Sequence, residues 1–270
     1  MHETGIIVAG IKGRMGHLIA QEAAHHEALA AGTVRMGDAS DGKSLLEIGM
    51  GNFGDGPVSS NLEGILTSLK EEHPNRQYVM IDFTSPEAML PHLGFAATHQ
   101  IPMLVGTTPM NEELNSAIDH AAKNIPIIYA ANTSLGANLQ HWITAKVAKA
   151  LPTADVEIME IHHKRKKDAP SGTATWLADG IMEASERGPM VLDRATHGLR
   201  KPKEVGVTAL RGGDVPGEHT AYFFLHDERI EISHKAQSRT IFAQGAVAAA
   251  FFLSGQVPGR YSMNDVLGLS

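Results

Sequence analysis

Short apolar runs alternate with stretches of helical periodicity along the first half of the chain. Apolar residues spaced three and four apart predict helices after residue 16, over 86–98 and over 111–123, whereas 37–60 is expected to be largely irregular. Strands that alternate with helices of about 10–15 residues are typical of a parallel, doubly wound sheet, so an α/β domain is predicted. The runs that predict its buried strands lie at 6–9, 30–36, 78–83, 101–105 and 125–129.

A glycine-rich turn follows the first apolar run and reads Gly10-Ile11-Lys12-Gly13-Arg14-Met15-Gly16. Glycines let the backbone turn tightly against a pyrophosphate, and N–H groups at the N-terminus of the next helix then bind the anion. Such a turn also arises for topological reasons alone, but its place in the first βα unit favours a Rossmann-type dinucleotide-binding domain. Cofactor contacts are predicted for Gly10, Ile11, Lys12, Gly13, Arg14 and Met15.

Small and polar residues also follow two later strands. Ligands of doubly wound sheets bind beyond the carboxyl ends of the strands, where a cofactor needs close approach to the backbone. We therefore expect further cofactor contacts from these positions, which are Gly106, Thr107, Thr108, Ala130, Ala131, Asn132 and Thr133.

The choice of dinucleotide depends on the residues after the second strand. An acidic residue about 20 positions beyond the glycine turn binds the ribose hydroxyls of NAD, and an arginine there suits the 2′-phosphate of NADP. Arg35 stands at the end of the predicted strand, and Asp38 follows it. NADPH is the predicted cofactor, with NADH as the alternative through Asp38; Arg35 as a solvated surface charge is the other interpretation.

The hydrophobic pattern changes to a period of two after Ala154. Strands are predicted at 155–163, 205–210, 220–225 and 229–233, and together they indicate a mixed sheet that is open on one face. The open face is a candidate oligomer contact. An Ala-rich helix over 241–253 is expected to return to the first domain. We thus predict a dinucleotide-binding domain formed by 1–133 with 241–270, and a smaller α+β domain for substrate binding and oligomerisation over 134–240.

A His pair, a basic run and a helix start occupy thirteen consecutive residues of this second domain. The segment reads His162-His163-Lys164-Arg165-Lys166-Lys167-Asp168-Ala169-Pro170-Ser171-Gly172-Thr173-Ala174. A helix N-terminus with two hydroxyls and a glycine is an anion site, and the basic residues lead directly into it. Separately, the run is typical of a solvated loop and Ser171 of a helix N-cap. Their combination predicts a pocket for a carboxylate, or for two.

Histidine and lysine suit the chemistry of a reduction at this pocket. Hydride delivery to an unsaturated carbon leaves electron density that a proton must neutralise, and histidine is a natural donor near neutral pH. Lysine adds a positive charge beside a developing anion and can relay a proton. His162 and His163 are neighbours on a strand and point to opposite faces, so no metal site is expected.

Composition narrows the classes of function. The 270 residues include no cysteine, which excludes a Cys nucleophile and zinc-thiolate sites. A net charge of −7 argues against nucleic acid as a partner. There is no apolar run of about 18 residues and no basic region before the first apolar run, so neither a membrane span nor a signal peptide is expected, and a cytoplasmic location is predicted.

The chain resembles the 4-hydroxy-tetrahydrodipicolinate reductase family, also named dihydrodipicolinate reductase, over essentially its whole length. The segment 160–174 is the most specific match, and shorter matches follow in order and spacing at 10–16, 81–84, 105–108, 130–132, 217–220 and 234–239. The chain departs from the family where Arg35-Met36 replaces an acidic residue, and where Thr133 replaces an aromatic found in some members.

The resemblance implies reduction of 4-hydroxy-tetrahydrodipicolinate to tetrahydrodipicolinate in the diaminopimelate route to lysine. It implies that His162 and Lys166 are the catalytic proton donors, and that the small dicarboxylate substrate is bound by His163, Ser171, Gly172 and Thr173. It also implies a homotetramer. Two alternatives remain, namely an NAD(P)-dependent dehydrogenase of another small carboxylic acid, and a dinucleotide sensor without turnover, which leaves the His-Lys-Ser-Gly-Thr pattern unexplained.

Overall fold

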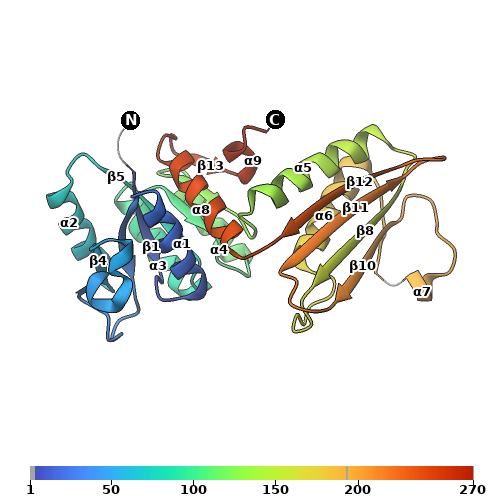
Figure 1. The fold of residues 1–270 in the computed structure, drawn as a ribbon. Helices are drawn as coiled ribbons and strands as arrows, with labels where there is room; N and C mark the ends of the chain where they lie inside the picture. The colour runs from blue at the N-terminus through green and yellow to red at the C-terminus, as the bar shows by residue number, and fades with distance from the viewer. Residues whose placement is uncertain (1–3, 193, 270) are drawn as a thin grey trace. The chain divides into compact units, whose positions relative to one another are not determined.

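The computed structural model describes residues 4–192 and 194–269, which form two compact units. The first unit contains the residues up to Ser134 together with Phe242–Gly268, and the second contains Leu135–Ile241. Each unit has its own sheet, labelled in Figure 1. Within the described residues, no helix is long and apolar enough to cross a membrane.

The sheet of the first unit has the strand order β13-β7-β6-β5-β1-β2-β4-β3. All neighbouring strands are parallel except β3 and β4, which are antiparallel. The strands are β1 (Thr4–Ala9), β2 (Leu29–Thr33), β3 (Lys43–Ser44), β4 (Pro57–Ser59), β5 (Gln77–Asp82), β6 (Met103–Val105), β7 (Pro126–Tyr129) and β13 (Gly259–Tyr261).

Helices connect these strands and bury one apolar face each. In α1, for example, Ile19, Ala20 and Ala23 are buried at helical spacing. The side chain of Asn111 caps α4 by accepting a hydrogen bond from the backbone N–H of Leu114. The helices are α1 (Arg14–His25), α2 (Leu62–Glu72), α3 (Pro86–Thr98), α4 (Glu112–Ala121), α8 (Thr240–Leu253) and α9 (Met263–Val266), with short helical turns at Leu46–Met50 and Gly51–Phe53.

The strand order reverses beside β1, which has β2 on one side and β5 on the other. The loops that follow β1 and β5 meet there, because a Cβ on Gly10 would lie 2.8 Å from Cγ2 of Thr84. This reversal is the topological switch point at which doubly wound sheets bind ligands. The predicted Rossmann-type fold class is confirmed, and the glycine turn lies at this switch point.

The second unit contains a mixed sheet with the order β12-β11-β8-β10-β9. Strands β8, β9 and β10 are parallel, and β11 is antiparallel to both β8 and β12. The predicted mixed sheet is therefore confirmed. The elements are α5 (Leu135–Ala150), β8 (Asp155–His162), α6 (Gly172–Ser185), β9 (Met190–Val191), α7 (Arg194–His197), β10 (Val205–Arg211), β11 (Gly217–Phe224) and β12 (Arg229–Ala236).

One face of this second sheet packs against α5 and α6. Its core includes Val156 and Ile158 of β8, Phe223 of β11 and Leu177 of α6. A fully buried aliphatic or aromatic side chain contributes about 1.5–3 kcal/mol, so this layer holds the two helices on the sheet. The inward-facing residues at the far end of the same strands are polar, and they form the site described below.

Several predicted boundaries were wrong. The second strand ends at Thr33 rather than at residue 36, and the strand expected over 101–105 begins at Met103. The stretch expected to be irregular contains β4, which extends the sheet beside β2. Helix α5 was not predicted, although it packs closely on α6 in the second unit.

Candidate functional site

The inward face of β8 changes from apolar to polar along the strand. Alternate residues of a strand share a face, and on the inward face Val156 and Ile158 are followed by Glu160 and His162. Glu160 is completely buried and His162 is 8% exposed. A buried carboxylate is costly unless every oxygen is hydrogen-bonded, so the surroundings of Glu160 are informative.

The carboxylate of Glu160 accepts four hydrogen bonds. Its Oε2 atom lies 2.6 Å from Nδ1 of His162 and 2.8 Å from Nη1 of Arg211. Its Oε1 atom lies 2.7 Å from Nη2 of Arg211 and 3.0 Å from the backbone N of Ser171. Residues from two strands and from the start of α6 thus converge on one carboxylate.

The electrostatics of this cluster keep Glu160 ionised. Burial alone would raise the pKa of Glu160, but the hydrogen bonds from Arg211, His162 and Ser171 hold it below its ordinary value. Burial lowers the pKa of His162, an effect that Glu160 opposes and that the charges of Lys166 and Arg211 reinforce. Lys166 therefore lies close enough for its charge to act on His162.

Ser171 joins the same cluster to the beginning of α6. Its hydroxyl oxygen caps the helix by accepting from the backbone N–H of Ala174 and lies 3.0 Å from Nε2 of His219 on β11. The ring of His219 in turn contacts the edge of the His162 ring, with 5.2 Å between centroids. Burial and the charge of His162 lower the pKa of His219 to about 4. Ser171 is thus an N-cap, and it also links the predicted proton donor to the predicted anion site.

The basic run divides into exposed and inward residues. Lys164, Arg165 and Lys167 are exposed, whereas the side chain of Lys166 is 21% exposed and lies 2.9 Å from Asp168. Arg165 pairs with Asp214 at 3.1 Å. Lys166 is thus the least exposed member of the run, and its charge acts on His162.

His163 has an unused hydrogen-bonding atom, and Gly172 has open space beside it. The Nδ1 atom of His163 is buried and has no hydrogen-bond partner among the described residues. A Cβ on Gly172 would meet no atom within 4 Å, so space is open at the start of α6, where Thr173 follows. A buried nitrogen without a partner is unfavourable, which is consistent with a bound group that supplies one.

The glycine turn of the first unit fits a dinucleotide. A Cβ on Gly16 would lie 2.2 Å from the carbonyl oxygen of Gly10, so this close approach of helix to turn requires glycine. The backbone N–H of Gly10 donates to Oγ1 of Thr33 at 3.0 Å, which fixes the turn to β2. Gly13 caps α1 without a side chain, which leaves room for an anion at this helix N-terminus.

Two charged residues after β2 have different environments. Arg35 is exposed. Asp38 pairs with Lys12 at 2.8 Å, and hydrogen bonds from Lys12 and Ser40 lower its pKa to about 2. Lys12 also donates to Ser40 at 3.1 Å, so its charge is directed toward this loop. The predicted contacts of Lys12 and Asp38 with a cofactor compete with this ion pair.

Asp82 at the end of β5 organises the predicted cofactor loop after β6. Its carboxylate is completely buried and accepts hydrogen bonds from Thr84, from Oγ1 of Thr107 at 2.9 Å and from Nδ1 of His92 at 2.6 Å. Burial would raise the pKa of Asp82, but the bonds from His92 and Thr84 lower it. The backbone N–H of Gly106 donates to the carbonyl oxygen of Asp82, so Asp82 holds the loop of Gly106, Thr107 and Thr108.

The loop after β7 is held by its own side chains. Oγ1 of Thr133 donates to the carbonyl oxygen of Phe242 at 2.7 Å, and Asn132 accepts from the backbone N–H of Ser134 at 2.9 Å. A Cβ on Gly245 would lie 1.7 Å from the carbonyl oxygen of Thr133, so α8 packs directly on this loop. The side chain of Thr133 is therefore committed to α8, and Ala130 and Ala131 precede it with small side chains.

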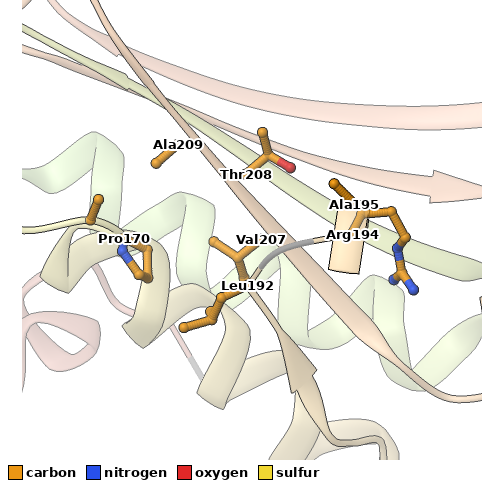
Figure 2. A pocket seen from close by; sticks show the side chains of 8 residues that line it. Pro170, Leu192, Arg194, Ala195, Val207, Thr208 and Ala209 are labelled. Atoms are coloured by element: carbon orange, nitrogen blue, oxygen red, sulfur yellow. The ribbon is translucent and has the colours of Figure 1, made fainter. Parts of the chain in front are cut away.

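A pocket of about 400 Å³ lies beside the loop before α6 (Figure 2). Among the described lining residues, the charged one is Arg194, which already pairs with Glu204 at 2.7 Å and with Glu157. His162 and Lys166 do not line it, so it is separate from the cluster on β8. Figure 2 shows side chains from β10, from α7 and from the loop before α6 around it; the lining residues are Ala169, Pro170, Leu192, Arg194, Ala195, Val207, Thr208 and Ala209.

Sequence interpretation named several site residues but missed the groups that hold them. Sequence interpretation assigned no roles to Glu160, Arg211, His219 and Asp82. Glu160 could have been identified, because it falls among the alternate positions of β8 that are buried, and a charged residue there needs partners. Among the described residues, no three His, Asp or Glu side chains gather in a way that could hold a metal ion.

Comparisons with known proteins cover both units. The family model described as dihydrodipicolinate reductase, N-terminus, matches residues 4–133, and the model described as dihydrodipicolinate reductase, C-terminus, matches residues 136–267. The solved structure of dipicolinate-bound dihydrodipicolinate reductase from Paenisporosarcina sp. TG-14 has a TM-score of 0.77 and 22% identity, covering 97% of this chain and 98% of that chain. That similarity supports the fold.

Two curated relatives are more similar in sequence. The 4-hydroxy-tetrahydrodipicolinate reductase of Myxococcus xanthus is 41% identical over 269 residues, with 97% of each chain covered. The enzyme of the same name from Pseudomonas fluorescens is 42% identical over 278 residues, with 98% of each covered. The resemblance found in the sequence is thus confirmed, and the chain belongs to the dihydrodipicolinate reductase family.

Proposed function

We propose that the chain catalyses the reduction of 4-hydroxy-tetrahydrodipicolinate to tetrahydrodipicolinate, a step of the diaminopimelate route to lysine. In this reaction the substrate takes up a hydride and a proton and releases water, while NAD(P)H becomes NAD(P)⁺. The main support for this proposal is the sequence identity of more than 40% to reductases of this name over nearly the whole chain. The cluster around His162 supports it, because the reaction needs a proton donor.

The family uses NAD(P)H as its reductant. When bound, the cofactor supplies the hydride. The turn of Gly10, Ile11, Lys12, Gly13, Arg14 and Met15 would hold its pyrophosphate, and the loops at 106–108 and 130–133 would hold its remaining groups. We infer a preference for NADPH over NADH, because Arg35 is exposed after β2, where an arginine suits a 2′-phosphate, while Asp38 is paired with Lys12.

His162 and Lys166 would supply the proton. Nε2 of His162 is the ring nitrogen that Glu160 does not engage, so this atom would give its proton to the carbon next to the one that is reduced. Lys166 would stabilise the negative charge that develops and serve as the second donor. A bound dianion beside His162 would raise the pKa of the imidazole and so favour its protonated form.

The substrate carboxylates would bind at the start of α6 and beside His163. Gly172 and Thr173 lie at the N-terminus of α6, where the partial positive charge of the helix favours an anion. The unpartnered Nδ1 of His163 would supply a further hydrogen bond. The N–H of Ser171 already binds Glu160, so Ser171 would contribute through its hydroxyl, which would turn its proton from His219 to the carboxylate when the substrate binds.

We further propose a homotetramer in the cytoplasm. The outward face of the second sheet carries Met159, Ile161, Tyr222 and Phe224, whereas α5 and α6 pack on the inward face. Partly exposed apolar and aromatic side chains on a sheet are typical of an oligomer interface. Size-exclusion chromatography with light scattering tests this proposal, and a monomeric mass would contradict it.

An assay with freshly generated 4-hydroxy-tetrahydrodipicolinate tests the main proposal. The purified protein should consume NADPH or NADH only when this substrate is present, and His162→Gln and Lys166→Ala should each lower kcat by about 10²–10⁴-fold while leaving cofactor affinity intact. Turnover of a different small carboxylic acid alone would favour the alternative dehydrogenase. Cofactor binding without any turnover would favour a sensor.

A further inference from the structure

We propose that Glu160, supported by Arg211, is the positioning residue of this site. It holds His162 and the start of α6 in fixed positions relative to each other. The proposal rests on the function proposed above, because it assigns His162 the role of proton donor. Glu160 itself does not face the substrate, since its side chain is fully buried and each of its oxygens accepts two hydrogen bonds.

An ionised carboxylate fixes the tautomer of the histidine that it contacts. It accepts hydrogen bonds only, so Nδ1 of His162 must carry the proton that lies toward Oε2 of Glu160, 2.6 Å away. Nε2 is then the nitrogen that gains and loses a proton. That atom lies next to Gly217, where a Cβ would be 2.9 Å from it, so the glycine leaves the space beside Nε2 open.

Arg211 makes a buried carboxylate compatible with an anionic substrate. An unpaired negative charge would repel a dianion and would be costly to bury. The two nitrogens Nη1 and Nη2 of Arg211 bind the two oxygens of Glu160 at 2.8 and 2.7 Å, which is the bidentate geometry of strong pairs. The pair is neutral overall, and His162 is held without adding a net negative charge.

The same two residues connect His162 to the substrate-binding loop. Oε1 of Glu160 accepts from the backbone N–H of Ser171, the N-cap of α6, at 3.0 Å. Nη2 of Arg211 also donates to the carbonyl oxygen of Asp168 at 2.7 Å, within the loop that carries Lys166. A shift of Glu160 would therefore move the proton donor, the helix start and the loop together.

The charged and titratable groups around His162 come from every neighbouring element. Glu160 lies on the same strand, Arg211 on β10 and His219 on β11, while Lys166 lies on the following loop. Of these groups, Glu160 is the one whose charge favours the imidazolium form. Its removal should therefore make protonated His162 harder to form.

Glu160→Gln is the informative variant because it keeps the shape and removes the charge. It should lower kcat about 10²-fold and move the descending limb of kcat/KM to lower pH by about 1–2 units. The matched control is Glu157→Gln, on the opposite face of the same strand, where Glu157 also pairs with arginines but not with His162. The control should keep the wild-type pH profile.

A double-mutant cycle separates positioning from general destabilisation. If Glu160 acts through His162, Glu160→Gln should cost little further activity in a protein that already carries His162→Gln. Additive losses, or a pH profile of Glu160→Gln that matches the wild type, would overturn the proposal. Cofactor affinity should be unchanged in each variant.

Nitrogen-15 NMR of the wild-type histidines tests the proposal without relying on Glu160→Gln to fold. The His162 signal, identified by its loss in His162→Gln, should show a protonated Nδ1 and an unprotonated Nε2 in the neutral form. The opposite tautomer would overturn the role of Glu160. Absence of turnover in the wild type would instead refute the proposed function, and the tautomer would still report on the Glu160–His162 contact.

Discussion

The Nε2 atom of His219 lies 3.0 Å from the hydroxyl oxygen of Ser171, which already accepts a hydrogen bond from the N–H of Ala174. The hydroxyl proton of Ser171 is therefore free to be donated to a neutral His219. Protonation of His219 would place a positive charge in a buried site beside His162, and burial is the main reason why the pKa of His219 falls to about 4.

This depressed pKa predicts that His219 lowers the stability of the folded protein in acid. Between about pH 6.5 and about pH 4 the unfolded chain binds a proton at His219 that the folded chain does not, so the free energy of unfolding falls as pH falls, by up to roughly 3 kcal/mol from this residue. Urea unfolding at several pH values should show a smaller pH dependence in His219→Gln than in the wild type.

The control for this measurement is His226→Gln, because the side chain of His226 is 95% exposed. This variant should keep the wild-type dependence on pH. Equal pH dependence in His219→Gln and the wild type would show that His219 titrates in the folded protein much as it does in the unfolded chain.

Gly16→Ala should damage the glycine turn. A methyl group there would lie 2.2 Å from the carbonyl oxygen of Gly10, so the turn must move away from α1. NADPH affinity, measured by fluorescence titration, should fall by about 10-fold or more, because the helix N-terminus no longer faces the pyrophosphate in the same way.

A second glycine provides the comparison for Gly16→Ala. Gly94 lies within α3, where an added Cβ would meet no atom within 4 Å. Gly94→Ala should leave NADPH affinity unchanged and stabilise the fold by up to about 1 kcal/mol through helix propensity. Retained affinity in Gly16→Ala would refute the assignment of this turn.

The fold class could be predicted because the hydrophobic pattern of each strand reflects which of its faces are buried. Continuous apolar runs such as Ile6-Ile7-Val8-Ala9 belong to strands covered on both faces, and the period of two after Ala154 marks a sheet with two unlike faces. Strand β4 has three residues, so it is too short to show a period. Helix α5 was missed because its buried positions include the polar residues Asn138, Gln140 and Thr144.

The supporting residues of the site depend on contacts between distant segments. Arg211 is 51 positions from Glu160 in the sequence, and His219 is 48 positions from Ser171. Spacing along the chain does not specify such pairs. Glu160 was accessible to prediction, because a carboxylate that alternates with Val156 and Ile158 falls on the buried face of a strand and requires partners.

Arg35→Ala should change the choice of cofactor. Arg35 is exposed two residues beyond the end of β2, and loss of a charged hydrogen bond to the 2′-phosphate should weaken NADPH binding by about 10- to 100-fold while affecting NADH much less. Titrations with both cofactors measure the ratio. Lys70→Ala removes an exposed positive charge from α2 and should leave the ratio unchanged, whereas an equal loss for both cofactors in Arg35→Ala would contradict the assignment.

Gly217→Ala should obstruct the nitrogen that is assigned to proton transfer. The added methyl group would lie 2.9 Å from Nε2 of His162 and 3.3 Å from its Cδ2 atom, so the ring must move or its nitrogen must be covered. Either change should lower kcat by about 10-fold or more, since a small misplacement of a reacting group is costly, and should spare NADPH affinity.

Gly212→Ala distinguishes obstruction of Nε2 from a general effect of an added methyl group near the site. Gly212 donates its backbone N–H to the carbonyl oxygen of His162, yet a Cβ on Gly212 would meet no atom within 4 Å. This variant should retain wild-type kcat, and thermal unfolding should show whether both variants remain folded at the assay temperature. Because Gly217 faces the ring itself, wild-type turnover by a folded Gly217→Ala would mean that the proton does not leave from Nε2.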